Sequence, residues 1–450
     1  MKQLEETSKY LERILGYIHS DNISDADKEL MTKETVHHFD NYVSPGWLKY
    51  RKSVSTNAAL LEWTDHDSSV VDLYGEDFID CLGGFGIYTC GHRNEYIVDT
   101  VKAQLGHQAL HSQELLDPLR GYLAKAVSEI TPGDLQYCFF TNGGAEANEM
   151  ALKLARIATG GRWFVSTVNA FHGKSMGAVS MGGKSTYRTP YTPMVQQVVH
   201  VEYGNAEDAR KAIRNLIAVG EKVAAFIVEP VQGEAGIIIP PEGYLKEIRA
   251  ICDEYGVALI CDEIQTGMGR TGHMFRCEGE GIVPDILTFG KAFGGGIMPI
   301  TGLICRPHMW TQELVDNPWL LGSPTFGGNP VCCSAALATI KYMIDHDIPA
   351  ECAKKGAIIK EGLDKLKEKY PDLIDDVRGI GLMLAVEFKT SEIGYEVAKG
   401  MFARKVITAG TLVNAKCVRF EPAAVITEDQ IAKVIERMDA SLADTRAAMK

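Results

Sequence analysis

Two charged residues follow apolar runs of the chain that predict β-strands. Asp262 comes directly after Val257–Cys261, and Lys291 follows Ile286–Phe289 and stands next to a group of glycines. Because parallel strands bring their carboxyl ends to one edge of a sheet, both side chains are expected at that edge. A lysine among apolar residues and glycines is poorly hydrated, which lowers the pKa of its amine and makes the neutral, nucleophilic form available. Taken alone, such a lysine is more often a solvated surface charge.

A third segment, Asn142-Gly143-Gly144-Ala145-Glu146, joins the predicted strand Leu135–Phe140 to a helical pattern. Backbone N–H groups and the helix dipole converge at this point, and glycines let a phosphate approach the main chain closely. The alternative is a plain turn with Asn142 as the helix N-cap. A phosphate site, a strand-end carboxylate and a lysine enclosed by glycines together predict a pyridoxal phosphate site, in which the carboxylate keeps the pyridine nitrogen protonated.

Two other glycine motifs fail in their context. Gly267–Gly272 fits the dinucleotide-binding pattern G-x-G-x-x-G, but two acidic residues separate it from the preceding strand, and His273–Pro284 is too short for a crossover helix. Ala178–Ser185 nearly matches a P-loop but begins with alanine in place of glycine. Neither a dehydrogenase nor a P-loop nucleotide-binding protein is therefore favoured.

Composition excludes further classes of function. The 450 residues include 46 Lys and Arg against 59 Asp and Glu, a formal net charge of −13, without the basic clusters of a nucleic-acid binder. No apolar run approaches the ~20 residues that span a bilayer, and the first residues lack a signal-peptide pattern. Eleven cysteines without a C-x-x-C pair indicate reduced thiols. We therefore expect a cytoplasmic protein with no membrane association and no metal site.

The remaining pattern predicts an α/β fold, because short apolar runs alternate with helical stretches. The expected strands of a largely parallel sheet are Leu135–Phe140, Trp163–Val168, Val223–Val228, Val257–Cys261, Ile286–Phe289 and Ile300–Cys305, and the expected helices between them include Glu146–Ile157 and Gly243–Tyr255. After Pro330 the pattern changes to the helical stretches Cys332–Ile344 and Lys354–Tyr370 and the β-rich block Leu382–Phe388. The expected division is an N-terminal helical segment (1–60), a large cofactor-binding domain (61–330) and a smaller α+β domain (331–450).

A long, ordered series of motifs carries a family resemblance. The motifs are Phe171-His-Gly-Lys, Glu229-Pro-Val-Gln-Gly-Glu234, Asp262-Glu-Ile-Gln265-Thr-Gly, Gly290-Lys291, Thr325-Phe-Gly-Gly-Asn-Pro330 and Arg378-Gly-Ile-Gly-Leu-Met. From about Asn41 to about Thr427 the chain resembles the class III pyridoxal-phosphate aminotransferases. The resemblance implies the fold-type I transferase architecture, in which helices flank a mostly parallel sheet and a smaller α+β domain follows.

The resemblance also implies roles for individual residues. Lys291 matches the lysine that bonds to the cofactor and moves the proton, and Asp262 matches the partner of the pyridine nitrogen. The other cofactor-binding matches are Gly143, Gly144 and Ala145 in the phosphate loop, Phe171 on the ring face, Gln265 near the ring hydroxyl, His172, Glu229, and Thr325, which reaches the phosphate of the other subunit. Phe171 and His172 are alternatively structural, and Glu229 alternatively braces the Asp262 region. The usual Asn-Ser-Gly-Thr-Glu loop is Asn142-Gly-Gly-Ala-Glu146 here, so two hydroxyl donors are missing and cofactor binding is expected to be ~1–2 kcal/mol weaker.

The implied reaction is a transamination in two halves. Arg419 and Glu234 match a substrate-binding pair that bonds together for the amine and opens for the carboxylate of the oxo acid; the alternative is a static ion pair. Within the family the resemblance is greatest to the putrescine-using members, through the stretches 45–54, 111–120 and 409–416. It implies putrescine, with cadaverine as a neighbour, as donor, 2-oxoglutarate as acceptor, and hence a role in polyamine catabolism. The same motifs would serve ornithine, 4-aminobutyrate or another ω-amine, with 2-oxoglutarate or pyruvate.

The Thr325 match implies a homodimer, and higher assembly stays open. Rival interpretations are a binding or regulatory protein that keeps the fold without turnover, and a decarboxylase or mutase that uses the same cofactor. The intact pair of Lys291 and Asp262 counts against the first, because a silent scaffold needs neither residue. A requirement for an added 2-oxo acid separates transamination from the second.

Overall fold

The computed structural model describes residues 2–48, 61–195 and 197–449. The chain divides into two compact units, Met1–Asp65 with Val70–Phe78, and His66–Ser69 with Ile79–Lys450. Every candidate site residue lies in the second unit. The division at residues 60 and 330 stays a prediction, and residues 49–54 of the stretch 45–54 lie outside the described residues. Among the helices in the described ranges, none combines the length and the apolar character needed to cross a membrane.

The first unit contains the helices that the sequence predicts at its N-terminal end, α1 (Lys2–Ile18) and α2 (Asp25–His38). Ser24 caps α2 by accepting a hydrogen bond from the Asp27 N–H, as a serine at this position is expected to do. Arg13 on α1 pairs with Glu34 on α2 through both carboxylate oxygens, at 2.7 and 3.0 Å. The strands of the N-terminal region are β1 (Glu62–His66), β2 (Ser69–Asp72) and β3 (Asp77–Asp80).

A seven-stranded sheet forms the centre of the second unit, in the order β4-β10-β9-β8-β7-β5-β6. Its strands are β4 (Tyr137–Thr141), β5 (Trp163–Thr167), β6 (Val198–Val201), β7 (Val223–Val228), β8 (Ala258–Asp262), β9 (Ile286–Phe289) and β10 (Thr301–Cys305). All six predicted strands are present. Strand β6 was not predicted; it is a four-residue edge strand that is mostly half-buried and contains His200. All neighbours pair in parallel except β10, which runs antiparallel to both β4 and β9.

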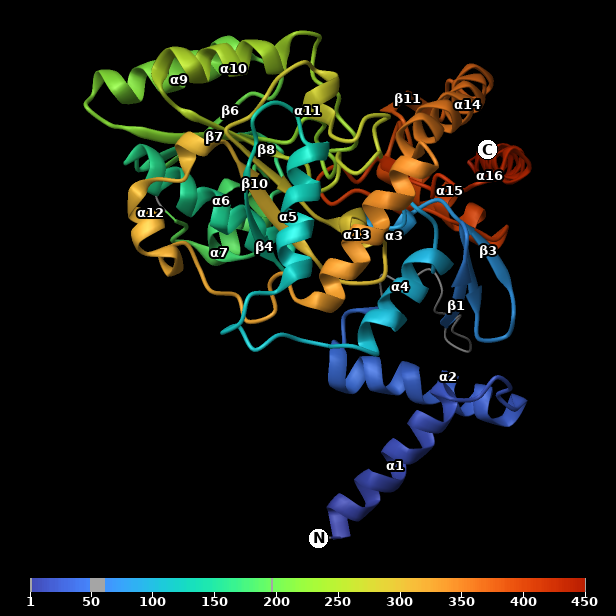
Figure 1. Ribbon diagram of the computed structural model, residues 1–450. Helices are drawn as coiled ribbons and strands as arrows, with labels where there is room; N and C mark the ends of the chain where they lie inside the picture. The colour runs from blue at the N-terminus through green and yellow to red at the C-terminus, as the bar shows by residue number, and fades with distance from the viewer. Residues whose placement is uncertain (1, 49–60, 196, 450) are drawn as a thin grey trace. The chain divides into compact units, whose positions relative to one another are not determined.

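Helices cover both faces of this sheet, which explains its continuous apolar strands (Figure 1). On one face, α9 (Ala206–Ala218) and α10 (Tyr244–Tyr255) pack against alternate residues such as Phe226 and Val228. On the other face, α6 (Gly144–Thr159) and α7 (Met176–Met181) pack against Ile227 and its equivalents in neighbouring strands. Both faces are dry, and the polar ends of the strands are therefore the places where chemistry can occur.

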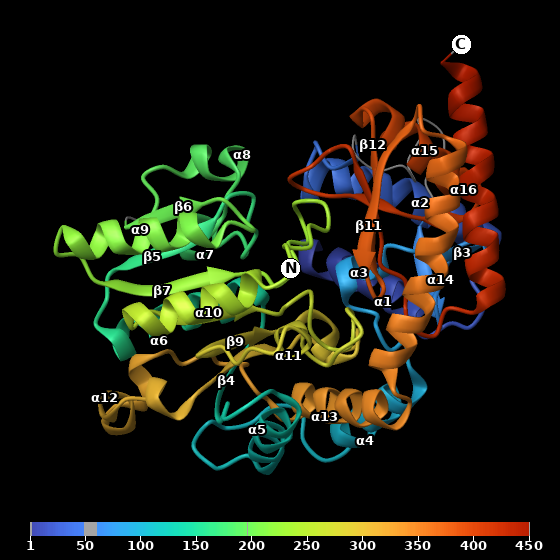
Figure 2. The ribbon, with the colours of Figure 1, turned by 90° about the horizontal axis from the view of Figure 1, so that it is seen from above.

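The C-terminal part carries a smaller antiparallel sheet with the order β11-β12-β15-β14. Figure 2 shows α14, α15 and α16 gathered beside it. The elements of this C-terminal part are α13 (Pro330–Asp345), α14 (Ile348–Lys369), β11 (Ile374–Ile380), β12 (Met383–Phe388), α15 (Ser391–Ala403), β14 (Ala409–Gly410), β15 (Cys417–Phe420) and α16 (Glu428–Ala448). This α+β region confirms the pattern that the sequence predicts after Pro330. A two-residue strand, β13 (Val406–Ile407), pairs in parallel with β3 at Ile79 and Asp80.

Shorter helices connect these layers. They are α3 (Gly83–Gly86), α4 (Glu95–Leu105), α5 (Pro118–Ile130), α8 (Ser185–Arg188), α11 (Arg276–Gly279) and α12 (Gln312–Asp316). The four-residue α11 follows the glycines of Gly267–Gly272, so the crossover helix of a dinucleotide site is absent there, and Ala178 lies inside α7 and not in a loop after a strand. Both rejected glycine motifs are thus structural.

Candidate functional site

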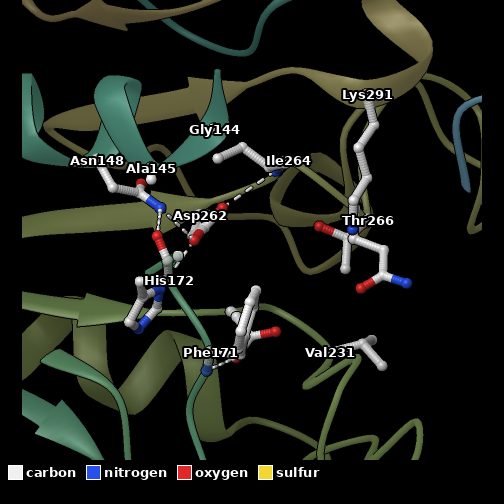
Figure 3. Close-up of a pocket in the computed structure, with 13 residues that line it drawn as sticks. Gly144, Ala145, Asn148, Phe171, His172, Val231, Asp262, Ile264, Thr266 and Lys291 are labelled. Atoms are coloured by element: carbon white, nitrogen blue, oxygen red, sulfur yellow. Dashed lines mark hydrogen bonds and ion pairs between the residues drawn. The ribbon is translucent and has the colours of Figure 1, made fainter. Parts of the chain in front are cut away.

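Asp262 is the last residue of β8 and is almost fully buried. Its Oδ2 atom accepts hydrogen bonds from Asn148 Nδ2 and His172 Nδ1, both at 2.8 Å. Its Oδ1 atom accepts longer bonds from the Ile264 N–H, at 3.2 Å, and from Thr288 Oγ1, at 3.4 Å. Figure 3 shows Asp262 between Asn148, His172 and Ile264. We call Asp262, Asn148, His172 and Thr288 the Asp262 end of the site.

The donors of the Asp262 end are themselves held in place. Asn148, one turn along α6, also donates to the His172 carbonyl at 2.8 Å, and Thr288 on β9 donates to Asn148 Oδ1 at 3.0 Å. Burial lowers the pKa of His172, but the hydrogen bond to Asp262 and the charges of Asp262 and Glu229 outweigh burial and raise it above the ordinary value. The raised pKa makes the protonated form of His172, which donates from Nδ1 to Asp262, more accessible than in a free imidazole.

The amino end of α6 adjoins Asp262. The helix begins at Gly144, and its N-cap Gly143 makes no side-chain hydrogen bond, so Asn142 does not cap the helix. A Cβ atom at Gly144 would lie 2.9 Å from Cδ1 at the end of the Ile264 side chain, which would have to shift, whereas Gly143 faces open space. The first N–H groups of a helix have no partner within the helix, and the dipole places positive potential beside them. An anion is therefore well accommodated at Gly143, Gly144 and Ala145.

Lys291 starts a single 3-10 turn directly after β9. Its φ of 46° lies in the left-handed region, which a non-glycine residue rarely adopts and which is typical of functional sites. Burial lowers the pKa of Lys291; the carboxylates of Glu421, Glu234 and Asp262 oppose this shift without cancelling it. No described residue forms a hydrogen bond with its amine. The neutral form of this lysine is thus more accessible than that of a solvated lysine.

A cavity of about 230 Å³ joins these groups, and Gly144, Ala145, Asp262, Gln265 and Lys291 are among the residues that line it. The Phe171 ring lines it as well, and Glu229 Oε1 accepts the Phe171 N–H at 2.8 Å while Oε2 accepts the Gly233 N–H at 3.1 Å. Burial raises the pKa of Glu229 to about 7. Glu229 thus braces the two backbone segments on either side of the ring position.

Arg419, on β15, is fully buried and is the centre of a second cluster. Its Nη2 atom donates to Glu234 Oε2 at 2.6 Å, and its Nη1 atom lies 3.9 Å from Glu421 Oε2. Glu421 Oε1 in turn accepts from Gln265 Nε2 at 2.8 Å. The guanidinium also lies 5.2 Å from the centre of the Phe85 ring. We call Arg419, Glu234, Glu421 and Gln265 the Arg419 end.

Comparison with known proteins identifies the family. The family model described as "Aminotransferase class-III" matches residues 54–442, most of the chain. The chain belongs to the class III aminotransferases.

Solved structures of similar fold agree. An ornithine aminotransferase from Toxoplasma gondii is 26% identical, with a TM-score of 0.83 over 96% of this chain and 100% of that one. A thermostable (S)-enantioselective omega-transaminase from Thermomicrobium roseum is 27% identical, with a TM-score of 0.84 over 94% of this chain and 100% of that one. A transaminase from the marine bacterium Virgibacillus is 25% identical, with a TM-score of 0.85 over 93% of this chain and 100% of that one. The fold is the fold-type I aminotransferase fold, and the prediction of the family is confirmed.

The cofactor of class III aminotransferases is pyridoxal 5′-phosphate, and the residues of this cavity fit it. The anchored Asp262 suits a protonated ring nitrogen, and the uncapped start of α6 suits a phosphate. Phe171 supplies a flat apolar surface for the ring, and Lys291 supplies the amine. The cavity therefore brings together the cofactor-binding residues that the sequence predicts, with two exceptions.

One exception is Gly143, which precedes the lining residue Gly144 as the N-cap of α6, and the other is Thr325, which is exposed and does not line the cavity of its own chain. Its carbonyl accepts a hydrogen bond from Gln113 Nε2 at 2.5 Å, and the neighbouring carbonyls of Gly327 and Gly328 accept from Arg120. The loop that carries Thr325 is thus held against the stretch 111–120 of the same chain.

Sequence reasoning missed three residues of the two ends. Asn148 left a signal, because it is an amide on the otherwise apolar face of the predicted helix, one turn after the phosphate loop. Thr288 is a polar residue within an apolar strand, three positions before Lys291. Glu421 stands two positions after Arg419, on the same side of an extended segment, and that spacing was available in the sequence.

Proposed function

We propose that this class III aminotransferase transfers an amino group from putrescine, and from cadaverine, to 2-oxoglutarate. With putrescine, the products are 4-aminobutanal and glutamate. The observation that carries this proposal is the buried ion pair of Arg419 and Glu234, whose charges act on Lys291, because it gives one site a means to accept both an amine without a carboxylate and a dicarboxylic oxo acid. Such a pair presents little net charge when closed and a carboxylate-binding guanidinium when open.

The stretches that resemble the putrescine-using members contact functional groups, which supports this choice of donor. In the stretch 409–416, the Leu412 N–H donates to Glu234 Oε2 at 2.8 Å, and the Gly410 carbonyl accepts from Arg419 Nε at 3.2 Å. The stretch 111–120 holds the Thr325 loop through Gln113. Residues that distinguish this branch thus surround the proposed substrate pair and the loop proposed to reach the neighbouring subunit.

Each residue of the Asp262 end has a proposed role. When bound, pyridoxal phosphate supplies the aldehyde that takes up the amino group and a ring that accepts the electrons left by proton loss at the substrate carbon. Asp262 keeps the ring nitrogen protonated, and His172 orients Asp262. Phe171 packs on the ring face, and Glu229 fixes the Phe171 backbone. Lys291, once displaced by the donor amine, moves the proton between the two reacting carbons.

The remaining proposed roles concern the phosphate and the ring oxygen. The N–H groups at Gly143, Gly144 and Ala145 bind the phosphate without the hydroxyl donors common in the family. Gln265 donates to the ring oxygen with the N–H that Glu421 leaves available, because its amide has two N–H bonds and Glu421 accepts one.

We infer that the active form is a homodimer in which Thr325 completes the site of the partner. Large apolar side chains beside the Thr325 loop support this, since Leu115, Leu116 and Phe326 are 80%, 100% and 55% exposed. Apolar patches of this kind mark interfaces. The eleven cysteines are all unpaired, which supports the proposed cytoplasmic location.

A panel of two substrates tests the proposed function. Putrescine, cadaverine, ornithine and 4-aminobutyrate are each combined with 2-oxoglutarate or pyruvate, and kcat/KM is measured for each pair. We expect putrescine with 2-oxoglutarate to give the highest value, cadaverine a somewhat lower one, and no sustained reaction without an oxo acid. A tenfold preference for ornithine, which the similarity to the Toxoplasma gondii enzyme makes the leading alternative, would overturn the choice of donor.

A further inference from the structure

Glu421 is a buried carboxylate to which the family resemblance assigns no role. It follows β15 directly, none of its surface is exposed, and its backbone N–H donates to the Cys81 carbonyl at 2.7 Å. One side-chain oxygen accepts from Gln265, but Oε2 has no hydrogen-bond partner among the described residues. This oxygen forms a long ion pair with Arg419 Nη1, which is 3.9 Å away and also has no hydrogen-bond partner among them.

The Arg419 end therefore contains two buried carboxylates and one guanidinium. Glu234 holds Arg419 at 2.6 Å and also accepts the Leu412 N–H, so its charge is well paired. Glu421 shares the same guanidinium only at the longer distance. With both carboxylates ionised, the three buried side chains carry a net charge of −1, and the charge of Glu421 also acts on Lys291. An incompletely paired charge in such a place is costly and interacts strongly with any charged ligand.

We propose that Glu421 is the specificity-determining residue that biases this site toward cationic amine donors and against the retention of carboxylate ligands. This inference rests on the proposed aminotransferase function and on the opening of the Arg419–Glu234 pair. While that pair is closed, the guanidinium balances the charge of Glu234, and the negative charge of Glu421 is left unbalanced. This charge attracts the ammonium group that every donor amine carries at neutral pH. When a carboxylate takes the guanidinium, Glu421 becomes a like charge beside it.

The consequence is opposite for the two halves of the reaction. The unbalanced negative charge strengthens binding of the diamine, whose second ammonium group stays charged during the whole half-reaction. The same charge weakens binding of 2-oxoglutarate and speeds release of glutamate, which carries two carboxylates. A site with Glu234 alone would bind dicarboxylates more tightly and release its product more slowly.

The decisive variant is Glu421→Gln, which removes the charge but keeps a carbonyl oxygen to accept from Gln265. The two half-reactions are measured separately by rapid mixing, with putrescine for one and 2-oxoglutarate for the other. We expect kcat/KM for putrescine to fall about tenfold and that for 2-oxoglutarate to rise by a similar factor, in line with the loss of one charge at this range. The binding of glutarate, a dicarboxylate that cannot react, is expected to tighten several-fold in calorimetry.

Matched variants separate charge from packing. Glu421→Asp keeps the charge and should keep the preference of the wild type. Glu387→Gln removes a carboxylate of the same small sheet, which pairs with Arg378 at 2.8 Å, and should leave the ratio of the two half-reactions unchanged. If Glu421→Gln does not fold, Glu421→Ala carries the same expected signs and the glutarate measurement is made on that variant.

The inference is overturned if both half-reactions change in the same direction or neither changes, because Glu421 would then serve the fold alone. It is also overturned if the affinity for glutarate stays constant. Failure of the proposed function looks different, since the wild type would then prefer another donor in the substrate panel. The opposite changes in kcat/KM of the two half-reactions in Glu421→Gln could still be tested with that donor.

Discussion

The Asp262 end, which lines the cavity, and the Arg419 end, which reaches it through Gln265, differ in how completely their charges are paired. Asp262 accepts four hydrogen bonds, and its donors Asn148 and Thr288 are bonded to each other. At the Arg419 end, one guanidinium serves two carboxylates, and Arg419 Nη1 and Glu421 Oε2 have no hydrogen bond within the described residues. The first arrangement suits a group that stays bound in one orientation, and the second suits partners that are exchanged in each cycle.

The local folds explain this difference. Asp262, Thr288 and Asn148 stand on strands β8 and β9 of the central sheet and on helix α6, which packs against that sheet, and only His172 comes from a loop. The Arg419 end joins the loop that carries Glu234 to a strand of the smaller sheet. Main-chain groups hold Arg419 Nε and Glu234 Oε2, through the Gly410 carbonyl and the Leu412 N–H, so an arriving carboxylate competes with Glu234 only for the Nη atoms of Arg419.

The largest expected effect comes from Lys291, on which both ends depend. Lys291→Met removes the amine while keeping an unbranched side chain, so multiple turnovers with putrescine and 2-oxoglutarate should fall by ~10³-fold or more. Steady-state rates measure this loss, and Lys341→Met, at a surface ion pair with Asp345, is the control that should match the wild type. Sustained turnover of Lys291→Met at the rate of the wild type would contradict the assignment.

Asp262→Asn removes the carboxylate at the Asp262 end, where both oxygens accept hydrogen bonds. The amide cannot accept from all four donors, and it removes the negative charge that the ring nitrogen requires. We expect both half-reactions to slow by a common factor of ~10²–10³, because both use the same cofactor. Single-turnover rates with each substrate provide the measurement, and a loss confined to one half-reaction would show that Asp262 acts on a substrate instead.

Arg419→Ala should change the two half-reactions by different factors, whereas Asp262→Asn should slow both by a common factor. The loss of a charged, two-pronged donor is expected to raise the concentration of 2-oxoglutarate required for half-maximal rate by ~10–100-fold, with a smaller change for putrescine. Arg419→Lys keeps the positive charge and should give an intermediate value. A weakened amine half-reaction with an unchanged oxo-acid half-reaction would contradict the exchange of partners.

The pattern of residues alone predicted Asp262 and Lys291, whereas His172 and the pair of Arg419 and Glu234 were predicted only through the family resemblance. Asp262 and Lys291 follow strands directly, so the edge of a parallel sheet brings them together as a rule of topology. The partners of Arg419 depend instead on how the loop after β7 meets the smaller sheet, which no local pattern describes. The antiparallel direction of β10 also escaped prediction, because its apolar pattern is the same in either direction.

The smallest effect is expected where a carboxylate braces the cavity without entering the reaction. Burial raises the pKa of Glu229 from 4.5 to about 7, so between these values the folded chain binds more protons than the unfolded chain. The free energy of unfolding should therefore decrease as the pH rises from about 4.5 to about 7, by at most ~3 kcal/mol from this group. Glu229→Gln removes this titration and should flatten the pH dependence in urea unfolding of the cofactor-free protein. A pH dependence identical to that of the wild type would mean that Glu229 is ionised throughout, held by the N–H groups of Phe171 and Gly233 and by the charge of His172.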